Sequence, residues 1–126
     1  MRALLVAAAL LVTSPLAAQQ TAATLTQQSA DAALRVLNLA VARYSAGTGN
    51  ADEVGTWGAR WFQARKDTGL TGPALLAAAQ EWLDKMRAFE AVAKSKVQSG
   101  LASQYDVELA GFYRLQAEAQ VARLKP

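Results

Sequence analysis

Two short segments of the chain, far apart in the sequence, carry the same succession of helix-ending and helix-starting residues. They are YSAGTGNADEV, residues 44–54, and VQSGLASQYDV, residues 97–107. In each segment a glycine is followed three residues later by a candidate N-cap residue, Asn50 or Ser103. Glycine accepts φ > 0 just past a helix, and Asn and Ser side chains cap the first turn of a helix. Each segment therefore predicts that one helix ends and another begins within about four residues, so that the chain reverses direction.

A constant offset of 53 residues relates the two segments. Gly47 corresponds to Gly100 at this offset, and Glu53–Val54 corresponds to Asp106–Val107. An acidic residue at the third helical position completes a capping box with the N-cap residue, so the two turns agree in physical role. We therefore predict an internal repeat. Its copies span about residues 26–68 and 73–124.

The sequence between and beyond the turns has helical periodicity. The clearest segment is 74–97, where apolar residues recur at spacings of four and three and form one stripe. The stripe consists of Leu75, Ala79, Trp82, Met86, Phe89 and Ala93. Glu81 and Lys85, and likewise Glu90 and Lys94, are four residues apart with the acid first, which predicts two ion pairs along the helix.

Three further helices are predicted at about 26–44, 51–66 and 104–124. The second is interrupted by Gly55 and Gly58, each costing about 1 kcal/mol relative to alanine, so packing must hold it. The last presents one apolar face made of Tyr105, Leu109, Phe112 and Ala119, with Leu115 beside it. Short loops make successive helices antiparallel. The predicted fold class is all-α, with two antiparallel helical hairpins that form an up-down four-helix bundle or elongated coiled-coil-like hairpins.

The N-terminal segment has the layout of a secretory signal peptide. One cation, Arg2, precedes an apolar run over residues 3–12, and Pro15 and small residues follow. The run is about half the length that a bilayer-spanning helix needs. We predict cleavage after Ala18, which leaves a helical-hairpin repeat domain at 19–126 in the periplasm or outside the cell, with no membrane span.

The composition excludes several classes of function. The chain has no His and no Cys, so the commonest general base, the commonest metal ligand and the thiolate nucleophile are all missing. We predict no catalytic residue, no metal site, no cofactor and no enzyme activity. Lys and Arg number 13 against 10 Asp and Glu, without a concentrated basic run, so nucleic-acid binding is not expected.

The tryptophans admit two interpretations. Aromatic residues at helical spacing usually belong to the core. The alternative is that Trp57, Trp61 and Trp82 line a site for a hydrophobic ligand, which would make the protein a small periplasmic carrier.

The repeated turn resembles the helical-hairpin tips of TolC-type outer-membrane efflux proteins. The features are a helix ending in aromatic-x-x-Gly, as at Tyr44 and Gly47, about five further residues, and Asp/Glu-Val opening the next helix. In that family two repeats supply such hairpins to a trimeric α-barrel in the periplasm, whose tips engage a periplasmic adaptor protein. The resemblance is confined to the tip repeats. It implies partner-binding positions at Gly47, Thr48, Gly49, Gly100, Leu101, Ala102 and Ser103.

These observations lead to one functional hypothesis. We expect a non-enzymatic exported protein that binds a protein partner, such as a periplasmic adaptor, or associates with copies of itself. The expected contact surfaces are the hairpin tips or the apolar helix faces.

Overall fold

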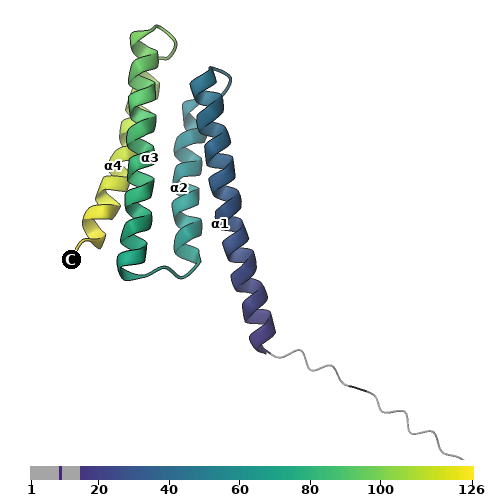
Figure 1. The fold of residues 1–126 in the computed structure, drawn as a ribbon. Helices are drawn as coiled ribbons and strands as arrows, with labels where there is room; N and C mark the ends of the chain where they lie inside the picture. Colours follow the sequence, from purple (N-terminus) through teal and green to yellow (C-terminus); the bar gives the residue numbers. More distant parts are fainter. Residues whose placement is uncertain (1–8, 10–14) are drawn as a thin grey trace, which may run out of the picture.

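The computed structural model describes residue 9 and residues 15–126, with side chains described from residue 21 onward in the helical part. Four helices occur in this part of the chain, and no strand does (Figure 1). They are α1 (Pro15–Ala46), α2 (Ala51–Asp67), α3 (Gly72–Gln98) and α4 (Gln104–Leu124). The predicted all-α class is confirmed. Most of the predicted signal peptide lies outside the described residues, and its cleavage stays a prediction.

The first helix is longer than the sequence analysis expects. It begins at Pro15, whereas the apolar periodicity indicated a start near residue 26. Pro at the start of a helix costs no hydrogen bond, and the following residues are mostly good helix formers. All described side chains from residue 21 to 29 are exposed or half-buried. This first part of α1 therefore follows from helix propensity more than from burial.

The helices pack as two hairpins that lie side by side. α1 packs along α2, and α3 packs along α4, as Figure 1 shows. α2 joins the hairpins because it also packs against both α3 and α4. Within the described residues α1 makes no extended contact with α3 or α4. The predicted pair of antiparallel hairpins is confirmed, with α2 as the central helix of the assembly.

The apolar stripe of α3 supplies much of the core. Ala79, Trp82, Met86, Phe89 and Ala93 are buried as predicted, and Leu75, the first member of the stripe, is half-buried. Large side chains from the first hairpin, Leu37 and Val54, are fully buried against the same cluster. The core therefore runs the length of the bundle between the hairpins.

The predicted apolar face of α4 is largely exposed. Phe112 and Leu115 are 52% and 56% exposed, and smaller residues occupy the inward face instead. The buried residues of this helix are Ala110, Ala117 and Val121. Alanine lets the backbones of packed helices approach more closely than large side chains allow. α4 therefore packs mainly through its small residues, with Leu109 and Tyr113 half-buried against the core, whereas Phe112 and Leu115 face outward.

The glycines within α2 have a packing reason. A Cβ at Gly55 would lie 2.1 Å from the ring of Tyr113 on α4, and one at Gly58 would lie 2.6 Å from the terminal methyl of Met86. Ordinary contacts begin near 3.4 Å. Glycine at these two positions therefore allows α2 to pack closely against α3 and α4.

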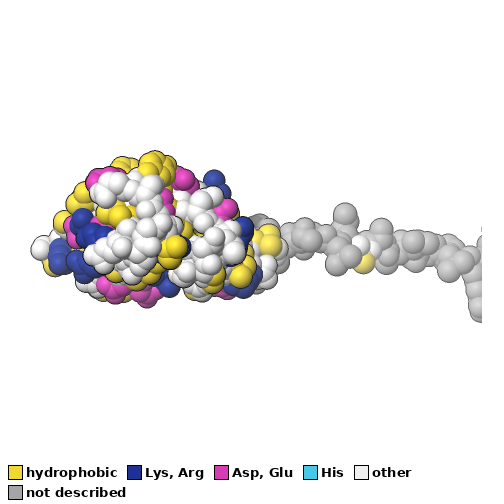
Figure 2. All heavy atoms as spheres, turned by 90° about the horizontal axis from the view of Figure 1, so that it is seen from above, with side chains coloured by type: hydrophobic (Ala, Val, Ile, Leu, Met, Phe, Trp, Pro, Cys, Tyr) yellow, Lys and Arg dark blue, Asp and Glu magenta, His cyan; other side chains and the backbone are white. Residues whose placement is uncertain are grey.

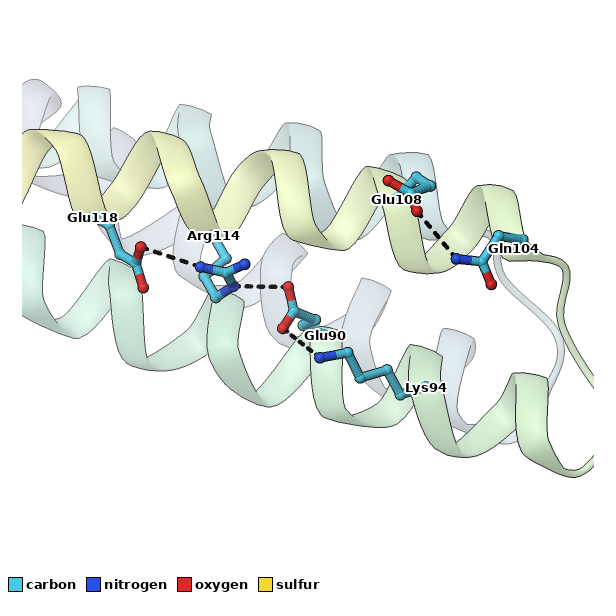
Figure 3. Close-up of polar contacts among 6 residues, drawn as sticks. All are labelled: Glu90, Lys94, Gln104, Glu108, Arg114 and Glu118. Carbon is cyan, nitrogen blue, oxygen red and sulfur yellow. Dashed lines mark hydrogen bonds and ion pairs between the residues drawn. The ribbon is translucent and has the colours of Figure 1, made fainter.

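A charged cluster ties α3 to α4 (Figure 3). Glu90 on α3 accepts hydrogen bonds from Arg114 Nε at 2.7 Å and from Lys94 Nζ at 3.0 Å. Burial alone would raise the pKa of Glu90, but these two cations outweigh it and lower the pKa below its usual value. The predicted Glu90–Lys94 pair is confirmed.

The second predicted ion pair along α3 does not form. Glu81 pairs with Arg65 of α2, and Lys85 has no ion pair among the described side chains. The packing of α2 on α3 brings the guanidinium of Arg65 to Glu81, and bidentate-capable Arg competes well for a carboxylate. Lys85 is consequently left without an acidic partner.

Candidate functional site

The two hairpin tips have the same backbone geometry. Gly47 has φ +82° and Gly100 has φ +72°, which is the left-handed conformation that favours glycine. Each glycine N–H donates to the carbonyl three residues back, at 3.1 Å and 3.0 Å, and the next N–H donates to the carbonyl five residues back. This is the Schellman arrangement of a helix C-terminus. The two predicted chain reversals are confirmed.

The helix starts after the tips differ from each other. The Asn50 side chain accepts a hydrogen bond from the Glu53 N–H at 3.0 Å, as an N-cap should. Ser103 makes no side-chain cap bond. The carboxylate of Asp106 accepts instead from the Tyr44 hydroxyl at 2.8 Å, so the predicted second capping box is wrong. The Asp106 carboxylate, which the local sequence pattern assigns to the cap, thus binds a residue of the other hairpin.

Hydrogen bonds between the hairpins hold the tips together. Besides Tyr44–Asp106, the Tyr105 hydroxyl donates to Asp52 at 2.9 Å, and Lys96 Nζ donates to the Tyr44 carbonyl at 2.6 Å. Burial and the hydrogen bond to Asp106 raise the pKa of Tyr44 well above its ordinary value. The hydrogen bond to Asp52 also raises the pKa of Tyr105. Both tyrosines therefore act as neutral donors, and the two tips form one end surface.

The first tip exposes polar and glycine backbone. Gly47 and Thr48 are exposed, and the Thr48 hydroxyl donates to the Arg43 carbonyl at 3.3 Å. Gly49 is half-buried, and a Cβ there would lie 2.9 Å from the Cβ of Arg43. Gly49 is therefore required by the turn itself.

The second tip exposes a large apolar side chain. Leu101 is 73% exposed, the highest value among the large hydrophobic residues of the described chain. Gly100 and Ser103 are exposed as well, and Ala102 is half-buried. Figure 2 looks down on the molecule from above the view of Figure 1, and hydrophobic side chains are visible on this end among charged groups of both signs. The predicted tip residues thus lie at one end of the molecule, and the second tip is the more apolar.

The exposed apolar surface continues from the second tip down α4. We call the residues Leu101, Tyr105, Phe112 and Leu115 the outer stripe; their exposure ranges from 52% to 73%. Tyr105, Phe112 and Leu115 have spacings of seven and three, which keep them on one side of α4, and Leu101 lies in the tip turn just before the helix. Phe112 and Leu115 border a shallow groove of about 400 Å³ that Glu90, Lys94 and Arg114 also line. Large apolar residues are also exposed on α1, at Leu25, Val36, Leu39 and Val41, but the outer stripe is the one that contains aromatic rings.

The sequence pattern grouped Tyr105, Phe112 and Leu115 on one apolar face, but it did not show whether that face packs inward or outward. A second stripe with the same period was present in the sequence, made of Val107, Ala110, Ala117, Val121 and Leu124. Two apolar stripes on one helix imply two packing faces. The smaller residues were the signal that could have identified the inward face.

The tryptophans belong mainly to the core. Trp61 and Trp82 are 3% and 6% exposed, and the Trp82 ring stacks on Phe62 with centroids 4.9 Å apart. Trp57 is half-buried, with the guanidinium of Arg60 4.8 Å from its ring centroid. The core interpretation is confirmed for Trp61 and Trp82. The three rings do not line a common surface for a ligand.

Two kinds of side-chain group are absent from the described residues. They contain no group of three or more His, Cys, Asp or Glu side chains close enough to hold a metal ion. No charged side chain is buried among them. None of the described helices combines the length and apolar character needed to cross a bilayer.

Comparisons with known proteins give no relative. No protein-family model matches the chain, and neither a curated protein nor a solved structure is detectably similar to it. The functional argument rests on the residues and their geometry.

Proposed function

We propose that the protein is a non-enzymatic, exported helical interaction protein that binds a protein partner, or a second copy of itself, through the outer stripe. The observation that supports this is a second apolar stripe on α4 and the tip turn before it, opposite the stripe that packs in the core and left uncovered by the described residues. The tip resemblance to efflux-protein hairpins favours a periplasmic adaptor as the kind of partner.

The chemistry of the outer stripe suits a protein partner. Full burial of a Leu or Phe side chain is worth about 1.5–3 kcal/mol, and aromatic residues are enriched among interface hot spots. Within α4 the stripe runs from Tyr105 to Leu115, about 15 Å at 1.5 Å per residue, and Leu101 extends it onto the tip turn. That length matches an amphipathic helix that binds by anchors at i, i+4 and i+7.

Charged groups beside the stripe would set its specificity. Glu90, Lys94 and Arg114 pair with one another at the edge of the groove, and they line it together with Phe112 and Leu115. Interfaces commonly surround an apolar centre with such a polar rim. Glu108 also lines the groove, so two anions balance two cations at the rim, and the apolar residues carry the affinity in this proposal.

The experiment introduces a charge into the outer stripe and measures association. Phe112→Glu and Leu115→Glu should abolish site-specific cross-links to partners in the native envelope, or lower the mass seen by light scattering. Gln116→Glu is the matched control, because it adds the same charge at an exposed position of the same helix. Circular dichroism should show unchanged folding for all three. If the two stripe variants associate as the parent does, the proposal is wrong.

The tips are tested separately. Leu101→Asp should weaken association, whereas Thr48→Asp should do so less, because Thr48 bonds to its own turn. Equal effects of the two variants would favour contact through both tips. N-terminal sequencing of the protein recovered from the envelope tests export and the predicted cut after Ala18.

A further inference from the structure

A groove lies between α1 and α3, with α2 beneath it. Its volume is about 180 Å³. Val54 of α2 and Phe89 of α3 line it, and both are almost completely buried. Val41 of α1 and Ala88 and Val92 of α3 complete its apolar lining. The groove exists because α1 packs along α2 and makes no extended contact with α3 among the described residues.

The polar residues of the groove are basic or neutral. Asn38, Ser45 and Lys85 line it together with Tyr44, and no acidic residue does. The Tyr44 hydroxyl is already engaged with Asp106. Lys85 is half-buried and has no ion pair among the described side chains. Its ammonium makes a cation–π contact with Trp61, 5.5 Å from the ring centroid, and no described carboxylate accepts a hydrogen bond from it.

We propose that this groove binds a small amphipathic carboxylate, with its alkyl or aryl part against Val54 and Phe89 and its carboxylate at Lys85. Charge complementarity identifies the head group, because the groove offers one uncompensated cation and two neutral hydrogen-bond partners, Asn38 and Ser45. A charged hydrogen bond to a carboxylate is stronger than a neutral one. A doubly charged phosphate would leave one charge without a partner here.

The size of the groove identifies the tail. An apolar cavity of about 150 Å³ is enough to hold benzene. A groove of 180 Å³ therefore accommodates an aromatic ring or an alkyl chain of about six carbons. This site is distinct from the outer stripe, because none of its lining residues comes from α4.

Hexanoate is the probe, titrated into the ¹⁵N-labelled full chain and followed by amide chemical shifts. We expect saturable shifts centred on Val54, Ala88 and Phe89. Hexylamine, which has the same chain and the opposite charge, should produce none. Hexanol should bind more weakly than hexanoate. Shifts that rise linearly with concentration, or equal shifts with hexylamine, would overturn the proposal.

Two pairs of variants locate the site. Lys85→Gln should weaken hexanoate binding about two- to fivefold, the range expected for a partly exposed ion pair, while Lys94→Gln on the same helix should not. Ala88→Met places a larger side chain at the groove and should weaken binding at least tenfold, while Ala91→Met at an exposed position beside it should not. Both methionine variants should fold normally because the replaced alanines are exposed. Phe112→Glu should leave hexanoate binding unchanged, which separates this site from the outer stripe. Loss of binding in the control variants, or its persistence in Ala88→Met, would refute the location.

Discussion

Replacement of Gly55 by alanine tests whether α2 depends on close contact with α4. Alanine normally stabilises a helix interior by about 1 kcal/mol relative to glycine. Here its Cβ would lie 2.1 Å from Cε2 and 2.2 Å from Cδ2 of Tyr113, against at least 3.4 Å in an ordinary contact. The ring or the helix would have to move by roughly 1.3 Å, the difference between the two distances. The tyrosine ring is also in edge contact with Phe112, at 5.2 Å between centroids.

The net effect is the difference of two terms. Insertion of a methyl group into a well-packed contact typically costs about 1–3 kcal/mol, and this contact is at the severe end of that range. Subtraction of about 1 kcal/mol of helix propensity leaves a net loss of about 1–2 kcal/mol. For a domain of about this size each kcal/mol lowers the melting temperature by about 4–8 °C, so the melting temperature should fall by roughly 4–16 °C.

Urea unfolding followed by circular dichroism measures the effect. Gly111→Ala is the comparison variant, because a Cβ there meets a single atom, Glu90 Oε2, at 3.2 Å, so that variant should lose less stability than Gly55→Ala. In a Tyr113→Ala background the same Gly55→Ala change should become stabilising, because the obstructing ring is gone. A Gly55→Ala protein as stable as the parent would refute the reasoning.

Two further predictions concern acid stability and helix caps. Because the pKa of Glu90 is lowered on folding, its stabilising contribution is complete above about pH 4.5 and is lost as the pH falls through the lower folded value. Glu90→Gln should therefore cost about 1–2 kcal/mol at pH 7, and its deficit relative to the parent should shrink at pH 3 in parallel urea titrations; a deficit independent of pH would contradict this. Asn50→Ala should cost about 1 kcal/mol, because the cap bond is made, whereas Ser103→Ala should cost far less, because its hydroxyl makes none. Equal losses in thermal melts would show that these caps are misassigned.

The helices and turns could be predicted from the sequence because local chemistry determines them. Gly47 and Gly100 follow helix ends with positive φ, as their positions after periodic segments indicated. The α3 stripe could be predicted for a similar reason. It was the single continuous apolar stripe on that helix, so its burial required no knowledge of the neighbours.

Competition between distant residues could not be predicted in the same way. Asp106 had a local role as a cap acid, but the Tyr44 hydroxyl arrives from 62 residues away and takes the carboxylate. Glu81 had a local partner in Lys85, but Arg65 reaches it from the neighbouring helix. In both cases the periodicity was correct, and the tertiary arrangement decided which partner was closest.

The outer stripe and the groove could not be predicted from the sequence for a related reason. α4 has two apolar stripes, and the choice between them depends on how closely α3 and α4 approach. Ala110 and Ala117 allow the closer approach, so Phe112 faces outward. The groove forms because α1 and α3 do not pack against each other along their length. No local pattern in α1 or α3 encodes that gap.

The residue after the tip glycine differs between the two tips, and so does its role in the fold. Thr48 satisfies its own turn with a hydrogen bond to the Arg43 carbonyl. At the equivalent position Leu101 has only its N–H engaged, with the Lys96 carbonyl, and its side chain remains 73% exposed. A Schellman turn is often accompanied by an apolar contact from this position to the residue five before it, but here that residue is Lys96, whose ammonium bonds to the Tyr44 carbonyl. The fold therefore does not depend on burial of the Leu101 side chain.

Leu101→Thr, which gives the second tip the side chain of the first, turns this contrast into a measurement. The free energy of unfolding should change by less than about 0.5 kcal/mol, as for other exposed surface positions. Association through the outer stripe should weaken by about tenfold, because the burial of a leucine on binding is worth about 1.5–3 kcal/mol and threonine retains part of it. Urea unfolding and quantitative cross-linking of the same preparation give the two values. A variant that loses stability while its association is unchanged would mean that Leu101 serves the fold after all.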